Sequence, residues 1–241
     1  PWAHSFGQTV ELHGLFSMGA ALGLAESVQT IVQNLSEVRP TLLFSVPRIF
    51  NRIYDGVHKK VEEDGGLKKA LFEGGLANSD RMREEIEKNG KPGFMTSLKN
   101  SFYDKIVFSK IRERFGGKLR YAFSGGAALS PEVARFVDNL HITVYEGYGL
   151  TETSPIATCN RPGARKIGSV GKPIPGVEIV LADVEGYDEP NVGEVCVRGP
   201  NVMQGYHNLP EKTAEVIDED GTFHTGDLGR LDDEGFLFII G

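Results

Sequence analysis

Apolar side chains in the first 160 residues follow the periods of helices that alternate with short strands. The run TLLFSV (41–46) is largely apolar and lies between Pro40 and Pro47, which indicates a buried strand. A helix is predicted over 48–57, where one helical face is apolar: Ile49, Phe50, Ile53, Tyr54 and Val57. A strand followed directly by an amphipathic helix is typical of an α/β domain.

Residues 58–115 are mostly polar, and they predict a helical excursion whose charged side chains face solvent. A clearer helix is expected at its end, where every fourth residue is apolar: Tyr103, Val107, Ile111 and Phe115. Gly116 and Gly117 then end this helix.

A strand, a helix and a second strand follow in regular order. The strands are predicted at KLRYAF (118–123) and HITVYEG (141–147), and Ser130 with Pro131 marks the start of the helix between them. Because a strand–helix–strand unit of this length places its strands parallel, we expect a mostly parallel sheet covered by helices.

The pattern changes near residue 161, where helical periods mostly vanish. Short alternating strands are predicted at 177–183, 193–199 and 236–240, with one short helix at 212–217. The sequence therefore predicts an α/β subdomain over 1–160, followed by a small β-rich subdomain over 161–241 that forms a distorted barrel.

Composition narrows the classes of function. The formal net charge of −7 over 241 residues argues against a general nucleic-acid binder, which needs clustered Lys and Arg. Cys159 and Cys196 fit neither a disulfide framework nor a zinc site, and none of the six histidines stands at zinc-ligand spacing from another ligand along the chain. Without a run of about 20 apolar residues or a signal peptide, we expect a cytoplasmic protein, with peripheral association at a membrane left open.

Two predicted strands end in glycine-rich loops, SGGAALS (124–130) and GYGLTE (147–152). Ligands of open α/β sheets bind beyond the carboxyl ends of the strands, so these loops are candidate walls of a nucleotide pocket. An ordinary turn is the commoner explanation for Gly125 and Gly126 alone.

The second loop carries more chemistry. Tyr148, between Gly147 and Gly149, can present its ring to a purine; Thr151 can bond a phosphate, and Glu152 can hold Mg²⁺ through oxygen. A packed tyrosine with a Thr-Glu helix cap is an equally good explanation on physical grounds.

Two further motifs offer single candidates. In FHTGDLG (223–229), Asp227 can accept two hydrogen bonds from a ribose diol, although an Asx-turn is commoner at such a position. His4, in PWAHSFGQT (1–9), is flanked by aromatic residues, where a hydrogen-bonded core histidine is commoner than a catalyst.

Taken together, these motifs resemble the adenylate-forming superfamily, which includes acyl-CoA synthetases, firefly luciferases and peptide-synthetase adenylation domains. EGYGLTETSP is the most specific match, and PWAHSFG, SGGAALS, GSVGKPIPGVEI, GEVCVRGPNVMQGY and FHTGDLG stand in the family's order. The segment 41–57, the helical excursion and His224 are most similar to long-chain fatty-acid–CoA ligases.

The resemblance implies a role for each matching residue. Tyr148 would stack on adenine opposite the backbone of Gly125 and Gly126, with Glu146, Gly147 and Gly149 beside the pocket. Thr151 would contact the α-phosphate, Glu152 would hold Mg²⁺, Asp227 would bind the ribose, and His4 would lie beside the acyl carboxylate.

The implied reaction joins a long-chain fatty acid to coenzyme A through an acyl-adenylate formed from ATP. A fatty-acyl-AMP ligase that uses a carrier protein, and a non-catalytic acyl- or nucleotide-binding module, stay open as alternatives, as does the oligomeric state. The chain starts at Pro1 without Met and ends in FLFIIG, so we expect a central fragment, inactive alone, without the family's phosphate loop and C-terminal domain.

Overall fold

The computed structural model describes residues 2–187 and 189–241, so Pro1 of the first motif lies outside the described residues. Two compact units are built from alternating segments of the chain. Unit 1 comprises residues up to Leu22, Phe123–Leu129 and Tyr145–Gly241, and unit 2 comprises Gly23–Ala122 and Ser130–Val144. The division predicted near residue 160 rests on secondary-structure content, a different criterion, and it remains a proposal.

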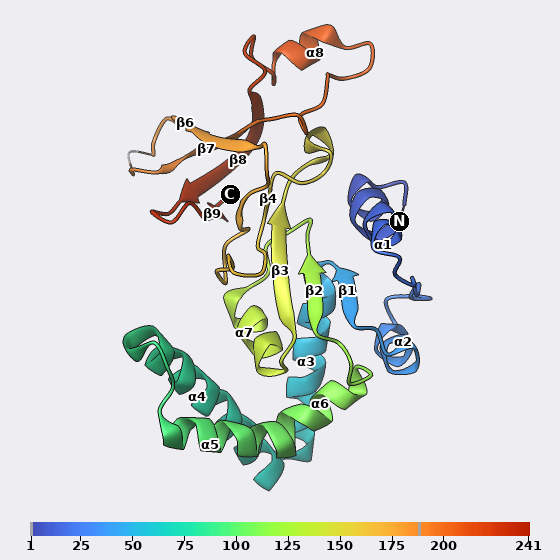
Figure 1. Ribbon diagram of the computed structural model, residues 1–241, viewed down its shortest axis with the longest axis vertical. Helices are drawn as coiled ribbons and strands as arrows, with labels where there is room; N and C mark the ends of the chain where they lie inside the picture. Colours follow the sequence, from blue (N-terminus) through green and yellow to red (C-terminus); the bar gives the residue numbers. More distant parts are fainter. Residues whose placement is uncertain (1, 188) are drawn as a thin grey trace. The chain divides into compact units, whose positions relative to one another are not determined.

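Unit 2 is mainly helical. Its elements are α2 (Ile31–Val38), β1 (Leu42–Ser45), α3 (Pro47–Asp64), α4 (Gly66–Asn89), α5 (Phe94–Tyr103), η2 (Asp104–Phe108), α6 (Ser109–Arg114) and α7 (Pro131–Asn139). Helix α4 packs against α3, α5 and α7, and the stretch predicted as a helical excursion is indeed helical (Figure 1).

An aromatic cluster forms part of the core of unit 2. The Phe136 ring lies 5.2 Å from Tyr54, 5.5 Å from His58 and 6.3 Å from Phe72 between centroids. Ser130 caps α7 as predicted, because its side chain accepts a hydrogen bond from the Val133 N–H at 3.2 Å.

Strands β2 (Tyr121–Ser124) and β3 (Thr143–Tyr148) begin in unit 2 and continue into unit 1. They belong to a five-stranded sheet of order β1-β2-β3-β4-β5, in which β1, β2 and β3 run in the same direction (Figure 1). The short strands β4 (Thr158–Cys159) and β5 (Lys172–Pro173) pair antiparallel, so this sheet is mixed.

Unit 1 also contains a four-stranded antiparallel sheet of order β6-β7-β8-β9. Its elements are β6 (Glu178–Ala182), β7 (Val192–Arg198), α8 (Pro210–Ala214), β8 (Phe223–Leu231) and β9 (Leu237–Ile239). The remaining elements of unit 1 are η1 (Gly7–His13), α1 (Gly14–Ser17) and η3 (Thr151–Thr153). An α/β fold followed by a β-rich region is confirmed.

The predicted elements differ from the structure in two informative places. FHTGDLG reads as a turn in the sequence, yet it lies within the nine-residue strand β8. The short helix α8 begins at Pro210, two residues before the predicted start, because proline suits the first helical position.

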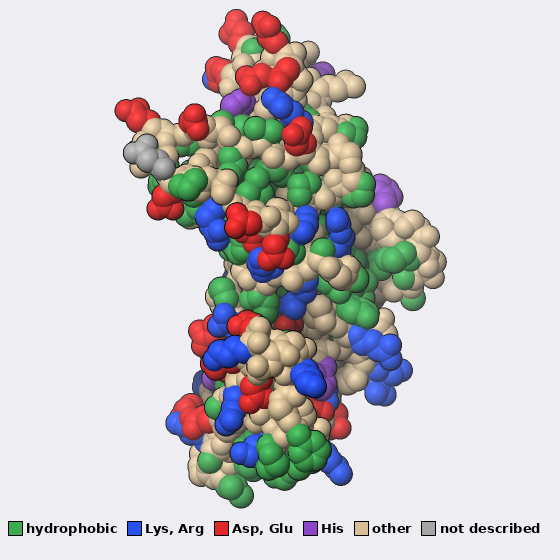
Figure 2. Space-filling model, turned by 60° about the vertical axis from the view of Figure 1, so that its left-hand side comes forward, with side chains coloured by type: hydrophobic (Ala, Val, Ile, Leu, Met, Phe, Trp, Pro, Cys, Tyr) green, Lys and Arg blue, Asp and Glu red, His purple; other side chains and the backbone are tan. Residues whose placement is uncertain are grey.

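Charged side chains of both signs are interspersed over the surface drawn in Figure 2. Many pairs in unit 2 lie one helical turn apart, such as Lys60–Asp64 at 3.0 Å and Arg81–Glu85 at 3.1 Å. Within the described residues, no helix is both long enough and apolar enough to cross a bilayer.

Candidate functional site

The residues singled out from the sequence motifs all fall in unit 1. They come from the start of the chain, the loop after β2, the end of β3 with the loop that follows, and β8. Segments that are far apart along the chain therefore contribute to one compact unit.

The loop after β2 packs against the first motif. A Cβ atom at Gly125 would lie 2.8 Å from the Phe6 ring, so the glycine permits this close approach. Gly126 has a φ of +81° and is exposed, which suits a backbone that turns sharply without a side chain. Gly125 thus permits a close contact with the first motif, whereas Gly126 is explained by the turn alone.

Glu146 in β3 anchors the end of this loop. The Leu129 N–H donates to Glu146 Oε2 at 3.2 Å, and only 6% of the residue is exposed. Burial raises the pKa of Glu146 to about 7, although hydrogen bonds from the backbone of Leu129 and Gly168 and the charge of Arg165 oppose this. Glu146 is therefore a buried carboxyl group that holds the end of this loop through its hydrogen bond to Leu129.

Tyr148 and Asp227 meet across unit 1. The Tyr148 hydroxyl donates to Asp227 Oδ2 at 2.6 Å. Burial and this hydrogen bond raise the pKa of Tyr148, so the phenol remains a donor. The Tyr148 ring also packs against the apolar core of unit 1, which fixes both motifs in one place.

The side chain of Thr225, not that of Asp227, makes the local hydrogen bonds at this position. Thr225 Oγ1 accepts from the Asp227 N–H at 3.1 Å and donates to the Val195 carbonyl at 2.6 Å. The Asp227 carboxylate is thus directed to Tyr148, so an Asx-turn does not account for its position.

Glu152 is likewise engaged by a distant residue. Tyr206, in the loop before α8, donates its hydroxyl to Glu152 Oε1 at 3.0 Å, and the Met203 N–H donates to the Glu152 carbonyl at 2.8 Å. At the start of η3, the Leu150 N–H donates a hydrogen bond to Thr153 Oγ1 at 2.8 Å. The acidic group therefore does not serve as the helix cap considered from the sequence.

Gly149 and Thr151 complete this loop. A Cβ atom at Gly149 would lie 2.1 Å from the Pro155 carbonyl oxygen, so only glycine fits there without a backbone shift. Thr151 is exposed, and its Oγ1 lies 3.4 Å from Ser5 Oγ. The loop after β3 and the first motif thus approach each other.

His4 is exposed, and its Nδ1 accepts a hydrogen bond from the Phe6 N–H at 3.2 Å. Because Nδ1 accepts this hydrogen bond, the neutral ring carries its proton on Nε2, which is therefore a donor. The observed exposure excludes the buried core histidine weighed in the sequence analysis.

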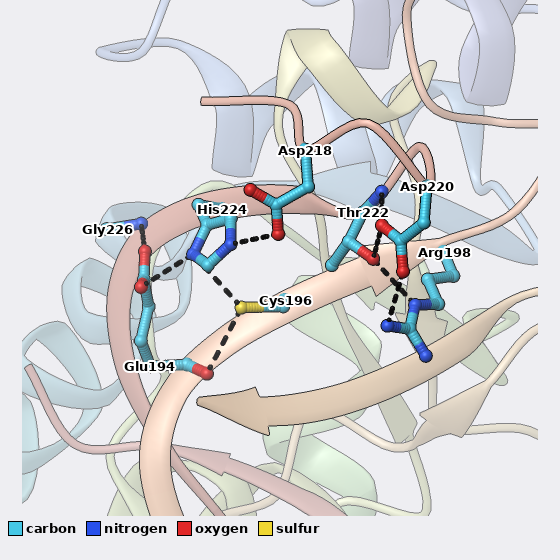
Figure 3. Close-up of polar contacts among 8 residues, drawn as sticks. All are labelled: Glu194, Cys196, Arg198, Asp218, Asp220, Thr222, His224 and Gly226. Atoms are coloured by element: carbon cyan, nitrogen blue, oxygen red, sulfur yellow. Dashed lines mark hydrogen bonds and ion pairs between the residues drawn. The ribbon is translucent and has the colours of Figure 1, made fainter. Parts of the chain in front are cut away.

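A polar cluster near Asp227 was not predicted from the sequence (Figure 3). His224 Nδ1 lies 2.9 Å from Glu194 Oε2 and 3.5 Å from Cys196 Sγ, and Nε2 lies 3.0 Å from Asp218 Oδ2. These two carboxylates raise the pKa of His224. Spacing along the chain misses this cluster because strand pairing, not sequence proximity, brings it together.

A β-bulge explains how β8 reaches this geometry. Glu194 pairs with Leu228 and Cys196 pairs with His224, so β8 has extra residues between these two positions. Three residues of β8, Thr225, Gly226 and Asp227, stand opposite the single residue Val195 of β7, and Gly226 takes a φ of +75°. Bulges commonly re-aim side chains next to functional sites, as this one does for Asp227.

Comparison with known proteins places this geometry in a family context. Residues 1–207 match the AMP-binding enzyme family. The peroxisomal long chain acyl-CoA synthetase 7 of Arabidopsis thaliana is 38% identical over 248 residues, covering 100% of this chain and 34% of that protein. Long-chain-fatty-acid–CoA ligase 5 of Rattus norvegicus is 36% identical over 245 residues, again covering 100% of this chain and 34% of the relative.

The chain spans about a third of the length of the curated relatives it matches. Among solved structures, a malonyl-CoA ligase in a ternary product complex with methylmalonyl-CoA and AMP superimposes with a TM-score of 0.65 at 27% identity. That alignment covers 100% of this chain and 42% of the other. The family match covers most of the sequence and agrees with the resemblance drawn from its motifs, and we conclude that this chain belongs to the AMP-binding enzyme family.

Proposed function

We propose that this chain is the nucleotide- and acyl-binding part of an ATP-dependent long-chain fatty-acid–CoA ligase. The observation that carries the proposal is the hydrogen bond from Tyr148 to Asp227 at 2.6 Å, which joins two motifs 79 positions apart. The identity to long-chain acyl-CoA synthetases supports the choice of fatty acid and coenzyme A as substrates.

Tyr148 and Asp227 are proposed to bind the adenosine part of ATP. With Asp227 Oδ2 held by Tyr148, the other carboxylate oxygen can accept from a ribose hydroxyl, and the Tyr148 ring can lie against adenine. Gly125 and Gly126 would border the base from the neighbouring loop, and Gly147 and Gly149 from the loop of Tyr148 itself. Glu146 would keep the first of these loops in place through Leu129.

Glu152 fits a site for Mg²⁺, a hard cation that prefers carboxylate oxygen. Tyr206 orients one oxygen of this carboxylate, and the second oxygen can face the cation. Mg²⁺ held there would offset the negative charge of the phosphates, while Thr151 donates its hydroxyl to the α-phosphate.

The proposed reaction has two steps. A carboxylate oxygen of the fatty acid bonds to the α-phosphorus of ATP, and the bond from that phosphorus to pyrophosphate breaks. The thiol of coenzyme A then attacks the acyl carbonyl and loses its proton to solvent, while the bond from the acyl carbon to the AMP oxygen breaks and AMP leaves with the electron pair. His4 would orient the acyl carboxylate through Nε2, since its Nδ1 is used within its own turn.

The test is fatty-acid-dependent exchange of labelled pyrophosphate into ATP by the protein with its complete reading frame. We expect exchange with long-chain acids and thioester formation when coenzyme A is added. Preference for acetate or an amino acid would overturn the substrate class, and transfer only to a carrier protein would overturn the acceptor. Fractionation of cells would test the cytoplasmic location and the membrane association that accompany this proposal.

A further inference from the structure

The cluster of Glu194, Cys196 and His224 has the composition and spacing of a transition-metal site. One donor atom from each of the three side chains lies within 4.8 Å of the other two. All three belong to the paired strands β7 and β8 (Figure 3), so the sheet holds them in place. We propose that this cluster binds Zn²⁺, or a chemically similar divalent transition metal, as a site separate from the proposed Mg²⁺ site.

The distance between the sulfur and nitrogen donors agrees with tetrahedral coordination. Zinc bonds of about 2.3 Å to sulfur and 2.0–2.1 Å to nitrogen place those two ligand atoms roughly 3.5 Å apart. Cys196 Sγ and His224 Nδ1 are separated by 3.5 Å. Glu194 Oε2 lies 2.9 Å from the same nitrogen, a few tenths of an ångström below the distance of about 3.3 Å between oxygen and nitrogen ligands of zinc. A shift of the Glu194 side chain would therefore bring its oxygen to a third ligand position.

The outer contacts also resemble those of zinc sites. A histidine that binds zinc usually donates its other ring N–H to a carboxylate. Here Asp218 Oδ2 lies 3.0 Å from His224 Nε2, which would direct the Nδ1 lone pair toward the metal. The second oxygen of Glu194 accepts from the Gly226 N–H at 2.9 Å, so this ligand is oriented as well.

Proton release and access permit binding. Zinc binds the thiolate of cysteine and the neutral ring of histidine, so protons on Cys196 Sγ and His224 Nδ1 would pass to solvent when the metal binds. Cys196 is only 1% exposed, but the side chains of His224 and Glu194 retain 31% and 25% of their exposure. An ion can therefore reach the sulfur past these two residues.

The site is tested by adding Zn²⁺ to metal-free protein in competition with a chromophoric chelator. We expect one equivalent to bind, and Co²⁺ in its place to give a thiolate-to-cobalt charge-transfer band with the visible spectrum of a tetrahedral complex. This result does not depend on the proposed ligase activity. Absence of binding at micromolar Zn²⁺ would overturn the proposal.

Three variants locate the site. Cys196→Ser should remove the charge-transfer band, whereas Cys159→Ser, at the other cysteine of the chain, should keep both the band and the affinity. Asp218→Asn changes an exposed residue and leaves the three proposed ligands in place, and it should weaken Zn²⁺ binding about 10- to 100-fold. The site would be contradicted by a band that survives in Cys196→Ser, by a band lost in Cys159→Ser, or by unchanged affinity in Asp218→Asn. Thermal melts would establish that each variant is folded.

Discussion

The two units use polar side chains in different ways. On the helices of unit 2, ion pairs such as Lys60–Asp64 in α3 and Arg81–Glu85 in α4 join residues four positions apart. In unit 1, hydrogen bonds join positions 79 apart for Tyr148 and Asp227, and 54 apart for Tyr206 and Glu152. Local pairs support the helix that carries them, whereas the long-range pairs fix the geometry of the candidate site.

Several contacts in unit 2 depart from this pattern. Arg39 donates to the Gly116 carbonyl across 77 positions, and Arg83 donates to the Arg135 carbonyl across 52 positions. Tyr54 donates to Glu132 at 2.5 Å and ties α3 to α7 over 78 positions. Burial, followed by the hydrogen bond to Glu132, raises the pKa of Tyr54 to about 12. This contact lies next to the aromatic cluster of unit 2, so packing is the property that a mutation there should change.

The largest effect on stability is expected from Phe136→Ala in the core of unit 2, which should leave the candidate site in unit 1 intact. Phe136 is 3% exposed, and its loss should lower the free energy of unfolding by about 3–5 kcal/mol through lost burial and a cavity. Denaturant titration measures this loss. ATP affinity of the protein that remains folded should stay near normal, and a lower affinity without lower stability would contradict the division of roles.

Glu152→Gln should show the opposite effect to Phe136→Ala, a slower reaction with unchanged stability. Removing the charge that faces the proposed Mg²⁺ should slow single-turnover adenylation by about 10²–10³-fold, or about 2.7–4 kcal/mol of barrier. The melting temperature should barely change, because the amide can still accept from Tyr206. Glu211→Gln, at an exposed position on α8, is the matched control; a normal rate together with a lower melting temperature would make Glu152 a structural residue.

Glu146 should make stability depend on pH. Its folded pKa of about 7 lies above the ordinary value of 4.5, so its contribution is fully present below pH 4.5 and is lost as pH rises through 7. At about 1.4 kcal/mol per pKa unit, the loss approaches about 3 kcal/mol. Glu146→Gln should flatten the fall in unfolding free energy between pH 5 and 8, and an equally steep profile in the variant would assign that fall to other groups.

Asp227→Ala should weaken ATP binding by about 1.5–3 kcal/mol, the range for hydrogen bonds to a charged group. Calorimetric titration with ATP measures this change. Tyr148→Phe retains the ring and removes only the hydroxyl, so it should weaken binding less. If both variants bind ATP normally and only melt earlier, the long-range pair stabilises unit 1 without serving a nucleotide.

The smallest effect is expected from Lys60→Ala on the surface of unit 2. Lys60 pairs with Asp64 across one helical turn, and its side chain retains 46% of its exposure. Such pairs contribute about 0.3–0.5 kcal/mol and are screened by salt. Denaturant titrations at low and high salt should differ by no more than this, and a loss above 1 kcal/mol would mean that local pairs matter more than proposed.

The sequence by itself determined the elements and the motif set of this protein. Apolar periodicity located β1, α3 and α7 to within a few residues, except that α3 extends beyond its predicted end. The order of EGYGLTETSP, FHTGDLG and the other motifs predicted the family, because these short patterns are local and do not depend on how the strands pair.

Only the tertiary structure decided which side chains meet. The hydroxyl of Tyr206 on Glu152, and the approach of His224 to Cys196 and Glu194, depend on the path of the chain, on strand register and on the bulge in β8. A shift of one residue in a strand turns its side chains to the opposite face of the sheet. Long-range register, set by packing of the whole unit, therefore decided the site geometry that local patterns could not contain.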